Sequence, residues 1–352
     1  QGVISTPVGL CAQIVAPWPP RGRIGVASQS GNLVSAFLNL AEQTGIGISR
    51  AVSAGNAAAT GLVDYLEWFA DDPETDVALC YVEGLSDGRD FFERVRQVSL
   101  KMPVVVIKGG TTSGGQRAAA SHTGSLASDD RIFSGMARQA GLLRSPSIEA
   151  AFDVAATLAT QPLPQGNQVV ILTTAGGWGV VAADAVTAHP DLELSTLPED
   201  LFATIDDMLP PRWSRNNPVD LAGGETRETI PELLHLVASH PDVDSILQLG
   251  LGIQGNTASL TRNGPFYPEH GLERIVDFHE RQEHLYATAA VEASSTYSKP
   301  ILVASELATA RPDNPMVAAV RGAGRLCYTS ADRAVAALGQ ASRYATWRRA
   351  RT

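Results

Sequence analysis

The sequence predicts an α/β protein built from two similar halves, each with a mainly parallel sheet between layers of helices. Short apolar runs alternate with segments of helical periodicity along most of the 352 residues. This alternation is typical of parallel strands that are covered by helices on both faces. A turn-rich stretch at 161–166 (QPLPQG) interrupts it near the middle of the chain, and the halves on either side resemble each other.

The first half contains four predicted strands. Residues 1–22 carry four prolines and are expected to form a connector from a preceding domain. A first domain at 23–160 follows, because four apolar runs are each succeeded by a segment of helical spacing. The strands are expected at 24–28, 50–53, Val77–Val82 and Val104–Lys108.

The second half repeats this organisation after a linker at 161–166. A strand begins at Gln168 and opens a second domain at 167–345. Residues 70–79 align with 238–247 without a gap, and 24–32 is similar in kind to 169–178. Two flavodoxin-like three-layer units are therefore predicted, with ligands at the carboxyl ends of their strands.

Composition excludes several classes of protein. The chain is 44% apolar and 18% charged, and it contains no run long enough to span a bilayer. Its net charge of −10 argues against a nucleic-acid partner. The cysteines and the other histidines lack metal-ligand spacing, so no metal site is expected. Three scattered cysteines indicate a cytoplasmic protein. A start at Gln1 without a leader indicates a start that is either trimmed or internal to a longer product.

Two strand-to-helix corners are candidate anion sites. Each places small or hydroxyl residues after a strand and directly before a helix, whose first N–H groups carry partial positive charge. Ser30 is a natural N-cap there, and an ordinary capped helix is the alternative interpretation. The candidate phosphate-binding residues are Ser28, Gln29, Ser30 and Gly31 in the first half and Gly176 and Gly177 in the second.

His122 stands in a run of small residues, Ala118 to Ala127, which leaves the imidazole accessible to a bulky anion. An imidazole nitrogen is a competent nucleophile near neutral pH, so phosphoryl acceptance is one hypothesis and a purely structural histidine is the other. Glu83 ends the third strand and could orient that imidazole, or it could simply face solvent. The counterpart of Glu83 in the repeat is Leu251.

Other residues are expected near the same edge. Each could also be only a turn residue, and the segment 250–270 is either a substrate-pocket lining or a flexible connection. The candidates for the vicinity of substrate or coenzyme are Gly55, Asn56, Lys108, Ser121, Thr123, Asn217 and Asp220.

Together these motifs resemble the ADP-forming acyl-CoA synthetase family, relatives of succinyl-CoA synthetase. The resemblance extends from about residue 5 to 340 and implies a succinyl-CoA-ligase-like domain followed by a ligase-CoA domain. The segments that carry it are 25–32, 55–56, 81–84, 104–109, 119–127, 173–179 and 217–220.

The resemblance implies a ligation in which a phosphoryl group passes through a phosphohistidine between acyl phosphate and nucleotide as acyl-CoA forms. His122 matches the phosphorylated histidine, Glu83 the residue that orients it, and the two corners the phosphate site. CoA and ATP or ADP are then substrates, with a small carboxylic acid or acyl phosphate. A CoA-binding domain and an ATP-grasp domain or subunit that carries Mg²⁺ are implied partners, in a homo- or hetero-oligomer. Ala57 and Trp178 depart from the lysine and the proline usual in the family.

Two alternatives remain at this stage. One is a non-catalytic module that binds acyl-CoA or a partner, as in synthetase-like protein acetyltransferases. The other is an acid-activating lyase of the same superfamily. The presence of both His122 and Glu83 favours the ligase over the non-catalytic module.

Overall fold

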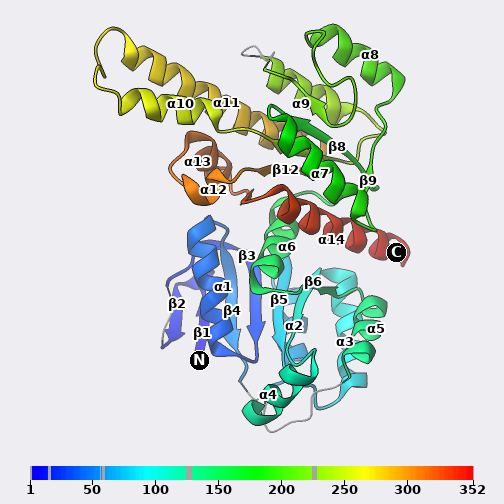
Figure 1. Cartoon of the computed structure of the whole chain (residues 1–352). Coiled ribbons are helices and arrows are strands. Elements are labelled where there is room, and N and C mark those ends of the chain that lie inside the picture. Colours follow the sequence, from blue (N-terminus) through cyan, green and yellow to red (C-terminus); the bar gives the residue numbers. More distant parts are fainter. Residues whose placement is uncertain are drawn as a thin grey trace. The chain divides into compact units, whose positions relative to one another are not determined.

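The chain forms two compact units, shown in the computed structural model of Figure 1. Unit 1 comprises Gln1–Ala159 and Tyr344–Thr352, and unit 2 comprises Thr160–Arg343. The structure describes residues 2–14, 17–55, 57, 60–123, 129–223 and 228–351, with the backbone alone at 119–123. The change of unit after Ala159 lies beside the predicted linker.

Unit 1 contains a seven-stranded sheet of order β2-β1-β4-β3-β5-β6-β7. Strands β3 to β7 run parallel, as predicted, and two of the predicted strands have the observed bounds. The strands are β3 (Arg21–Ser28), β4 (Ile48–Ser53), β5 (Val77–Val82), β6 (Val104–Lys108) and β7 (Leu143–Arg144). The helices are α1 (Gly31–Thr44), α2 (Leu62–Asp71), α3 (Gly88–Lys101), α4 (Ser113–Thr123), α5 (Asp130–Ala140) and α6 (Ile148–Thr160).

This strand order places a binding edge between β3 and β5. The order β4-β3-β5-β6-β7 is that of a flavodoxin-like fold, and the chain leaves β3 toward β4 but returns to pair β5 on its other side. Ligands bind at such switch points, outside the carboxyl ends of the strands. The fold therefore brings the ends of β3 and β5 together, where residues 28–31 and Glu83 follow them.

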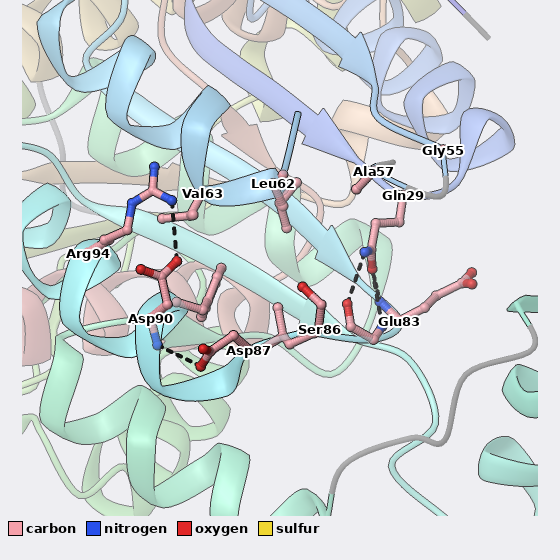
Figure 2. A pocket seen from close by; sticks show the side chains of 14 residues that line it. Gln29, Gly55, Ala57, Leu62, Val63, Glu83, Ser86, Asp87, Asp90 and Arg94 are labelled. Atoms are coloured by element: carbon pink, nitrogen blue, oxygen red, sulfur yellow. Dashed lines mark hydrogen bonds and ion pairs between the residues drawn. The ribbon is translucent and has the colours of Figure 1, made fainter. Parts of the chain in front are cut away.

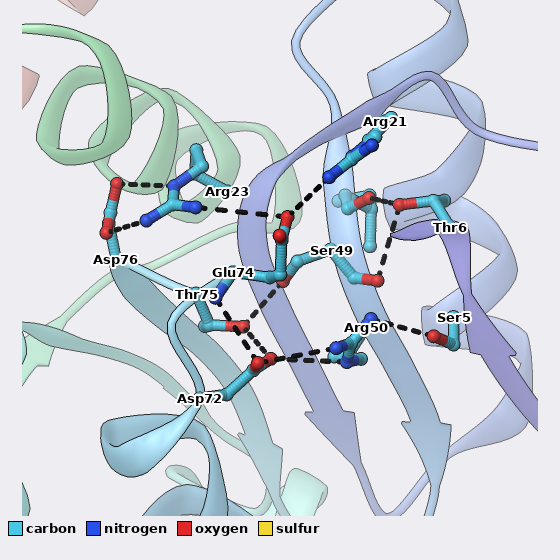
Figure 3. A network of polar contacts seen from close by, with 11 residues as sticks. Ser5, Thr6, Arg21, Arg23, Ser49, Arg50, Asp72, Glu74, Thr75 and Asp76 are labelled. Atoms are coloured by element: carbon cyan, nitrogen blue, oxygen red, sulfur yellow. Dashed lines mark hydrogen bonds and ion pairs between the residues drawn. The ribbon is translucent and has the colours of Figure 1, made fainter. Parts of the chain in front are cut away.

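The prediction that residues 1–22 form a connector was wrong. They contain β1 (Gly2–Ser5), a 3₁₀ turn (Thr6–Val8) and β2 (Leu10–Gln13), and β1 pairs antiparallel with β4. Buried polar contacts hold this hairpin in place (Figure 3). Arg50 of β4 donates to the Ser5 hydroxyl at 2.7 Å and pairs with Asp72 at 3.2 Å. Pro7 lies in the turn between these two four-residue strands, and strands this short beside a proline are hard to recognise in the sequence.

Unit 2 repeats the topology of unit 1. Its strands are β8 (Gln168–Thr173), β9 (Glu193–Leu194), β10 (Val219–Asp220), β11 (Ser245–Leu249), β12 (Ile301–Ala304) and β13 (Cys327–Tyr328). The order is β10-β8-β11-β12-β13. Strand β9 pairs with the same edge of β8 as β10, at the opposite end of that strand. All these pairings are parallel, so the predicted flavodoxin-like repeat is confirmed.

One helix of unit 2 lies where a loop was expected. Residues 250–270 contain α10 (Ile253–Arg262), which packs against the long α11 (Leu272–Tyr297). The buried Glu283 of α11 accepts hydrogen bonds from the N–H groups of Gly252 and Gln254 at the start of α10. The others are α7 (Gly176–Ala188), α8 (Glu199–Met208), α9 (Thr229–Ser239), α12 (Leu307–Ala310), α13 (Pro315–Gly322) and α14 (Ala331–Arg349).

The last turns of α14 belong to unit 1. The Tyr344 hydroxyl donates to the Ser99 carbonyl of α3 at 2.9 Å, and Trp347 lies directly over Gly141. Both side chains are buried. The sequence did not predict this return of the chain, because both residues lie in the predicted second domain or after it. Within the described ranges, no helix is long and apolar enough to cross a membrane.

Candidate functional site

Gln29 joins the ends of β3 and β5. Its Oε1 accepts the N–H groups of Glu83 at 2.5 Å and Gly84 at 3.2 Å, and its Nε2 donates to the Gly84 carbonyl at 3.0 Å. One side-chain amide thus satisfies three backbone groups of the loop that carries Glu83. The arrangement fixes this loop relative to the start of α1.

Ser28, rather than Ser30, supplies the hydroxyl that shapes the first corner. The fully buried Ser28 Oγ accepts the Ser30 N–H at 3.0 Å and donates to the Ser30 carbonyl at 2.8 Å. Ser30 occupies the N-cap position of α1, but among the described residues its side chain makes no capping hydrogen bond. The expectation of side-chain capping by Ser30 was therefore wrong. A first turn without such a cap keeps N–H groups available for an anion.

Unit 2 builds the same corner with different residues. Thr173 Oγ1 accepts the Ala175 N–H at 3.0 Å and donates to the Ala175 carbonyl at 2.9 Å, as Ser28 does with Ser30. Thr174 Oγ1 donates to the Gly250 carbonyl at 2.7 Å, which corresponds to the link made by Gln29. In the described part of the chain, α7 likewise has no side-chain cap.

Glu83 lies just beyond β5 and is only 8% exposed. Ser28 pairs with Tyr81 in unit 1 and Thr173 pairs with Leu249 in unit 2, so the register makes Leu251 the counterpart of Glu83, as predicted. The half-buried Tyr81 lies beside Glu83, because a Cβ added at Gly109 would stand 2.5 Å from Tyr81 Oη and 3.4 Å from Glu83 Cγ. Burial, followed by the negative charge of Glu83, raises the pKa of Tyr81 to about 12, so its hydroxyl stays protonated and donates.

Lys108 supports the same loop from the end of β6. Its buried Nζ donates to the Glu83 carbonyl at 3.2 Å and to the Gly109 carbonyl at 2.5 Å, and it lies 5.8 Å from the centre of the Phe133 ring. Burial lowers the pKa of Lys108, and neighbouring Asp130 opposes that shift. Lys108 therefore holds the backbone around Glu83 in place.

The backbone of His122 lies in the last turn of α4, which Figure 1 shows beyond the carboxyl ends of the unit 1 strands. Ser121 and Thr123 share that turn. The side chains of these three residues lie outside the described part of the structure, as does Asn56 as a whole. That the side chain of His122 lies beside Glu83 therefore remains a prediction.

A cavity of about 470 Å³ opens beside the Glu83 loop (Figure 2). Gly55 lies on its wall, as expected of a substrate-vicinity residue, and Arg94 lies on another part of the wall, paired with Asp64, Glu67 and Asp90. This volume is in the range of small-molecule sites. Its lining comprises Gln29, Gly55, Ala57, Gly61, Leu62, Val63, Glu83, Gly84, Leu85, Ser86, Asp87, Asp90, Phe91 and Arg94.

The four candidate residues of unit 2 fall into two groups. Gly176 and Gly177 open α7, and a Cβ at Gly176 would stand 2.6 Å from Asp220 Oδ2, so Asp220 lies at that corner. Asn217 is buried, and its amide bonds to Ile171 N–H and to the Val169 and Ser195 carbonyls. That amide fills the gap between β9 and β10, so the structure gives Asn217 a structural role.

Tyr81 and Gly109 belong to motifs recognised in the sequence, but the sequence interpretation gave neither residue a role at the site. A Cβ at Gly109 would stand 2.5 Å from the Tyr81 hydroxyl. The usable signal was the spacing of Tyr81 and Glu83, because residues two apart on a strand share a face.

Two family descriptions match the chain. Residues 21–158 match the succinyl-CoA ligase like flavodoxin domain, and residues 169–254 match the ligase-CoA domain. Both matches agree with the two units described above.

Curated relatives and solved structures extend the comparison. The chain is 41% identical over 248 residues to acetate–CoA ligase [ADP-forming] I subunit alpha of Pyrococcus furiosus, covering 70% of this chain and 53% of the relative. It is 37% identical over 227 residues to acetate–CoA ligase [ADP-forming] of Methanocaldococcus jannaschii, covering 64% of this chain and 32% of the relative. The Ca. Korarchaeum cryptofilum dinucleotide forming acetyl-coenzyme A synthetase 1, solved in complex with phosphate and ADP, superimposes with a TM-score of 0.79 at 30% identity. That superposition covers 99% of this chain and 70% of the other.

Proposed function

Because the chain belongs to the ADP-forming acyl-CoA synthetase family, we propose that it is the part of an acid–CoA ligase that carries a phosphoryl group on His122. The observation that carries the proposal is the placement of Glu83. This buried carboxylate stands at the switch point of a flavodoxin-like sheet, beside a helix start that the described side chains leave uncapped. The backbone of His122 follows on α4 at the same edge.

The proposed reaction has three balanced steps. An imidazole nitrogen of His122 attacks the γ-phosphorus of ATP, so that an N–P bond forms and ADP leaves. A carboxylate oxygen of the acid then takes the phosphoryl group and regenerates the imidazole. The sulfur of CoA attacks the acyl carbon of the acyl phosphate and releases inorganic phosphate.

Glu83 acts in this scheme on the second imidazole nitrogen. A carboxylate that accepts its N–H fixes the tautomer and leaves the other nitrogen unprotonated for attack. The uncapped start of α1 supplies backbone N–H groups to the phosphoryl oxygens at Gly31, and the start of α7 at Gly176 and Gly177 is a second anion site within unit 2. The cavity beside Gly55 receives the acid.

The partners follow from the same proposal. The chain spans 32% and 53% of the two curated relatives described above. We propose that an ATP-grasp domain or subunit with Mg²⁺ and a CoA-binding domain complete the enzyme, in an oligomer. Burial raises the pKa of the Cys80 and Cys327 thiols to about 12, so both stay protonated. Such unreactive thiols are compatible with the proposed cytoplasmic location.

The test is phosphoryl transfer to His122. The complete enzyme, with its ATP-grasp part, is incubated with γ-labelled ATP and Mg²⁺, and the chain alone is incubated with labelled acetyl phosphate. We expect label that is acid-labile and alkali-stable, absent in His122→Asn and formed at least about 100-fold more slowly in Glu83→Gln. His284→Asn, an exposed histidine on α11, is the matched control. Equal labelling of His122→Asn would refute the proposal, and ligand binding without any labelling would favour the non-catalytic alternative.

A further inference from the structure

Tyr81 and Glu83 share one face of unit 1 with Gly109. Tyr81 pairs with Ile107 on the neighbouring strand, and the Gly109 N–H continues this ladder by donating to the Val82 carbonyl at 2.8 Å. Alternate residues of a strand point to opposite faces. Cys80 and Val82 point into the core formed with α2, α3 and α5, so Tyr81 and Glu83 point to the other face.

Gly109 leaves the space that the Tyr81 hydroxyl occupies. A Cβ added at Gly109 would stand 2.5 Å from Tyr81 Oη, 3.2 Å from Tyr81 Cζ and 3.4 Å from Glu83 Cγ. The first of these distances is closer than real Cβ contacts allow. Any larger residue at 109 therefore displaces the phenol from beside the Glu83 side chain.

The backbone of Glu83 is already held from two sides. Gln29 accepts its N–H, and Lys108 donates to its carbonyl from the opposite face of the sheet. These contacts place the Cα of Glu83 but leave the rotation of its carboxylate to other groups. Tyr81 Oη and Glu83 Cγ both lie against the position that a Cβ at Gly109 would take, so the phenol lies beside the side chain of Glu83 itself.

We propose that Tyr81 is a positioning residue that holds the Glu83 carboxylate in the orientation needed by the His122 imidazole, and that Gly109 is required because it admits the Tyr81 hydroxyl. This inference rests on the proposed function. It adds two residues to the site, of which one acts through Glu83 and the other through Tyr81.

The experiment compares Tyr81→Phe, Gly109→Ala and the double variant in the labelling assay of the complete enzyme. We expect each single variant to slow the labelling of His122 about 10-fold at saturating ATP, with the KM for ATP unchanged. Because phenylalanine lacks the hydroxyl that the new Cβ would meet, the double variant should be no slower than Tyr81→Phe. Tyr65→Phe and Gly135→Ala are controls, since a Cβ at Gly135 meets nothing within 4 Å.

Two outcomes would overturn the inference. One is an unchanged rate in Tyr81→Phe, and the other is a double variant whose defect is the product of the two single defects. A purely structural loss would lower the unfolding midpoint of Tyr81→Phe in parallel with the rate, so midpoints are measured on every variant.

A second readout separates this inference from the proposed function. If the wild-type protein is never labelled, the proposed function fails. The urea-unfolding midpoints of Tyr81→Phe, Glu83→Gln and their combination still test the contact, because two residues that are hydrogen-bonded give non-additive shifts. Additive shifts would show that Tyr81 does not hold Glu83.

Discussion

Ser28 and Ser30 are two residues apart, yet the structure gives their hydroxyls different roles. Ser28 Oγ bonds both backbone groups of Ser30, while Ser30 occupies the N-cap of α1 without a side-chain cap among the described residues. A buried hydroxyl that satisfies two backbone groups shapes the loop, whereas an uncapped Ser30 leaves helix N–H groups for a ligand.

We predict that Ser28→Ala lowers the free energy of unfolding by about 1–2 kcal/mol and that Ser30→Ala lowers it by less than about 0.5 kcal/mol. Ser28→Ala removes two hydrogen bonds in the core, whereas Ser30→Ala removes no capping hydrogen bond among the described residues. Urea-unfolding midpoints measure both changes. Thr173→Val in unit 2 is the matched comparison and should behave like Ser28→Ala, because Thr173 makes the equivalent pair of bonds. A larger loss for Ser30→Ala would contradict the assigned roles.

At the scale of elements, His189 joins the end of α7 to the side of α14. The residue is the C-cap of α7, and its Nδ1 accepts the Asp191 N–H at 3.2 Å. Gly339 of α14 lies against the imidazole ring, and a Cβ there would overlap it. Burial lowers the pKa of His189, with Asp191 opposing and Arg343 reinforcing that shift. The neutral ring is therefore the form that packs.

The lowered pKa of His189 makes the folded protein less stable in acid. As the pH falls below the ordinary value of 6.5, the unfolded chain takes up the proton before the folded chain does. The contribution of His189 to stability is therefore complete above about pH 6.5 and is lost below it, toward the lower pKa of the folded state. We predict that wild type loses more stability than His189→Asn between pH 7.5 and 5.5. Asparagine keeps an acceptor near the Nδ1 position and does not titrate.

Unfolding midpoints at pH 7.5, 6.5 and 5.5 measure the difference. The exposed His284→Asn variant should follow the wild-type curve over this range. Parallel pH curves for wild type and His189→Asn would contradict the prediction.

At the scale of the whole molecule, unit 1 is completed by residues from the far end of the sequence. Tyr344 and Trp347 stack at 6.2 Å, and Trp347 Nε1 donates to the Gln139 carbonyl at 3.3 Å. Gly141 has a φ of 77°, and its missing side chain admits the Trp347 ring. The end of α5 therefore depends on a tryptophan about 200 residues later.

We predict that Trp347→Ala destabilises unit 1 by about 3–5 kcal/mol, as expected for removal of a buried large aromatic side chain. Amide hydrogen exchange should rise in α5 and β7, while β8 and β11 keep their protection. Arg349→Ala, which removes an exposed side chain on the same helix, is the control. A uniform rise in exchange over both units would contradict the assignment of these residues to unit 1.

The repeated α/β organisation could be predicted because the main strands are recognisable from their own apolar residues. Val77–Val82 is an unbroken apolar run, and Val104–Lys108 is apolar up to its final lysine, so both bounds were predicted correctly. The β1–β2 hairpin was missed because its strands are short and partly exposed, and pairing with β4 stabilises them. Helix α10 was missed because its start depends on Glu283, about 30 residues later.

The site was predictable to the extent that it lies on strand ends. Glu83 and Ser28 follow buried strands, and parallel strands bring such ends together. Which hydroxyl bonds which backbone group was not predictable, because Ser28 and Ser30 are equivalent in sequence pattern. The role of Asn217 depends on the gap between β9 and β10, which is a property of the assembled sheet.

The position of Trp347 has a consequence for biosynthesis. Residues up to Ala159 are synthesised well before Trp347. Until Trp347 is added, the surface of unit 1 at Gly141 is uncovered. During that interval the apolar surface that Trp347 later covers is exposed to solvent, and such exposed surface favours aggregation. Maturation of the first unit thus waits for translation of the second.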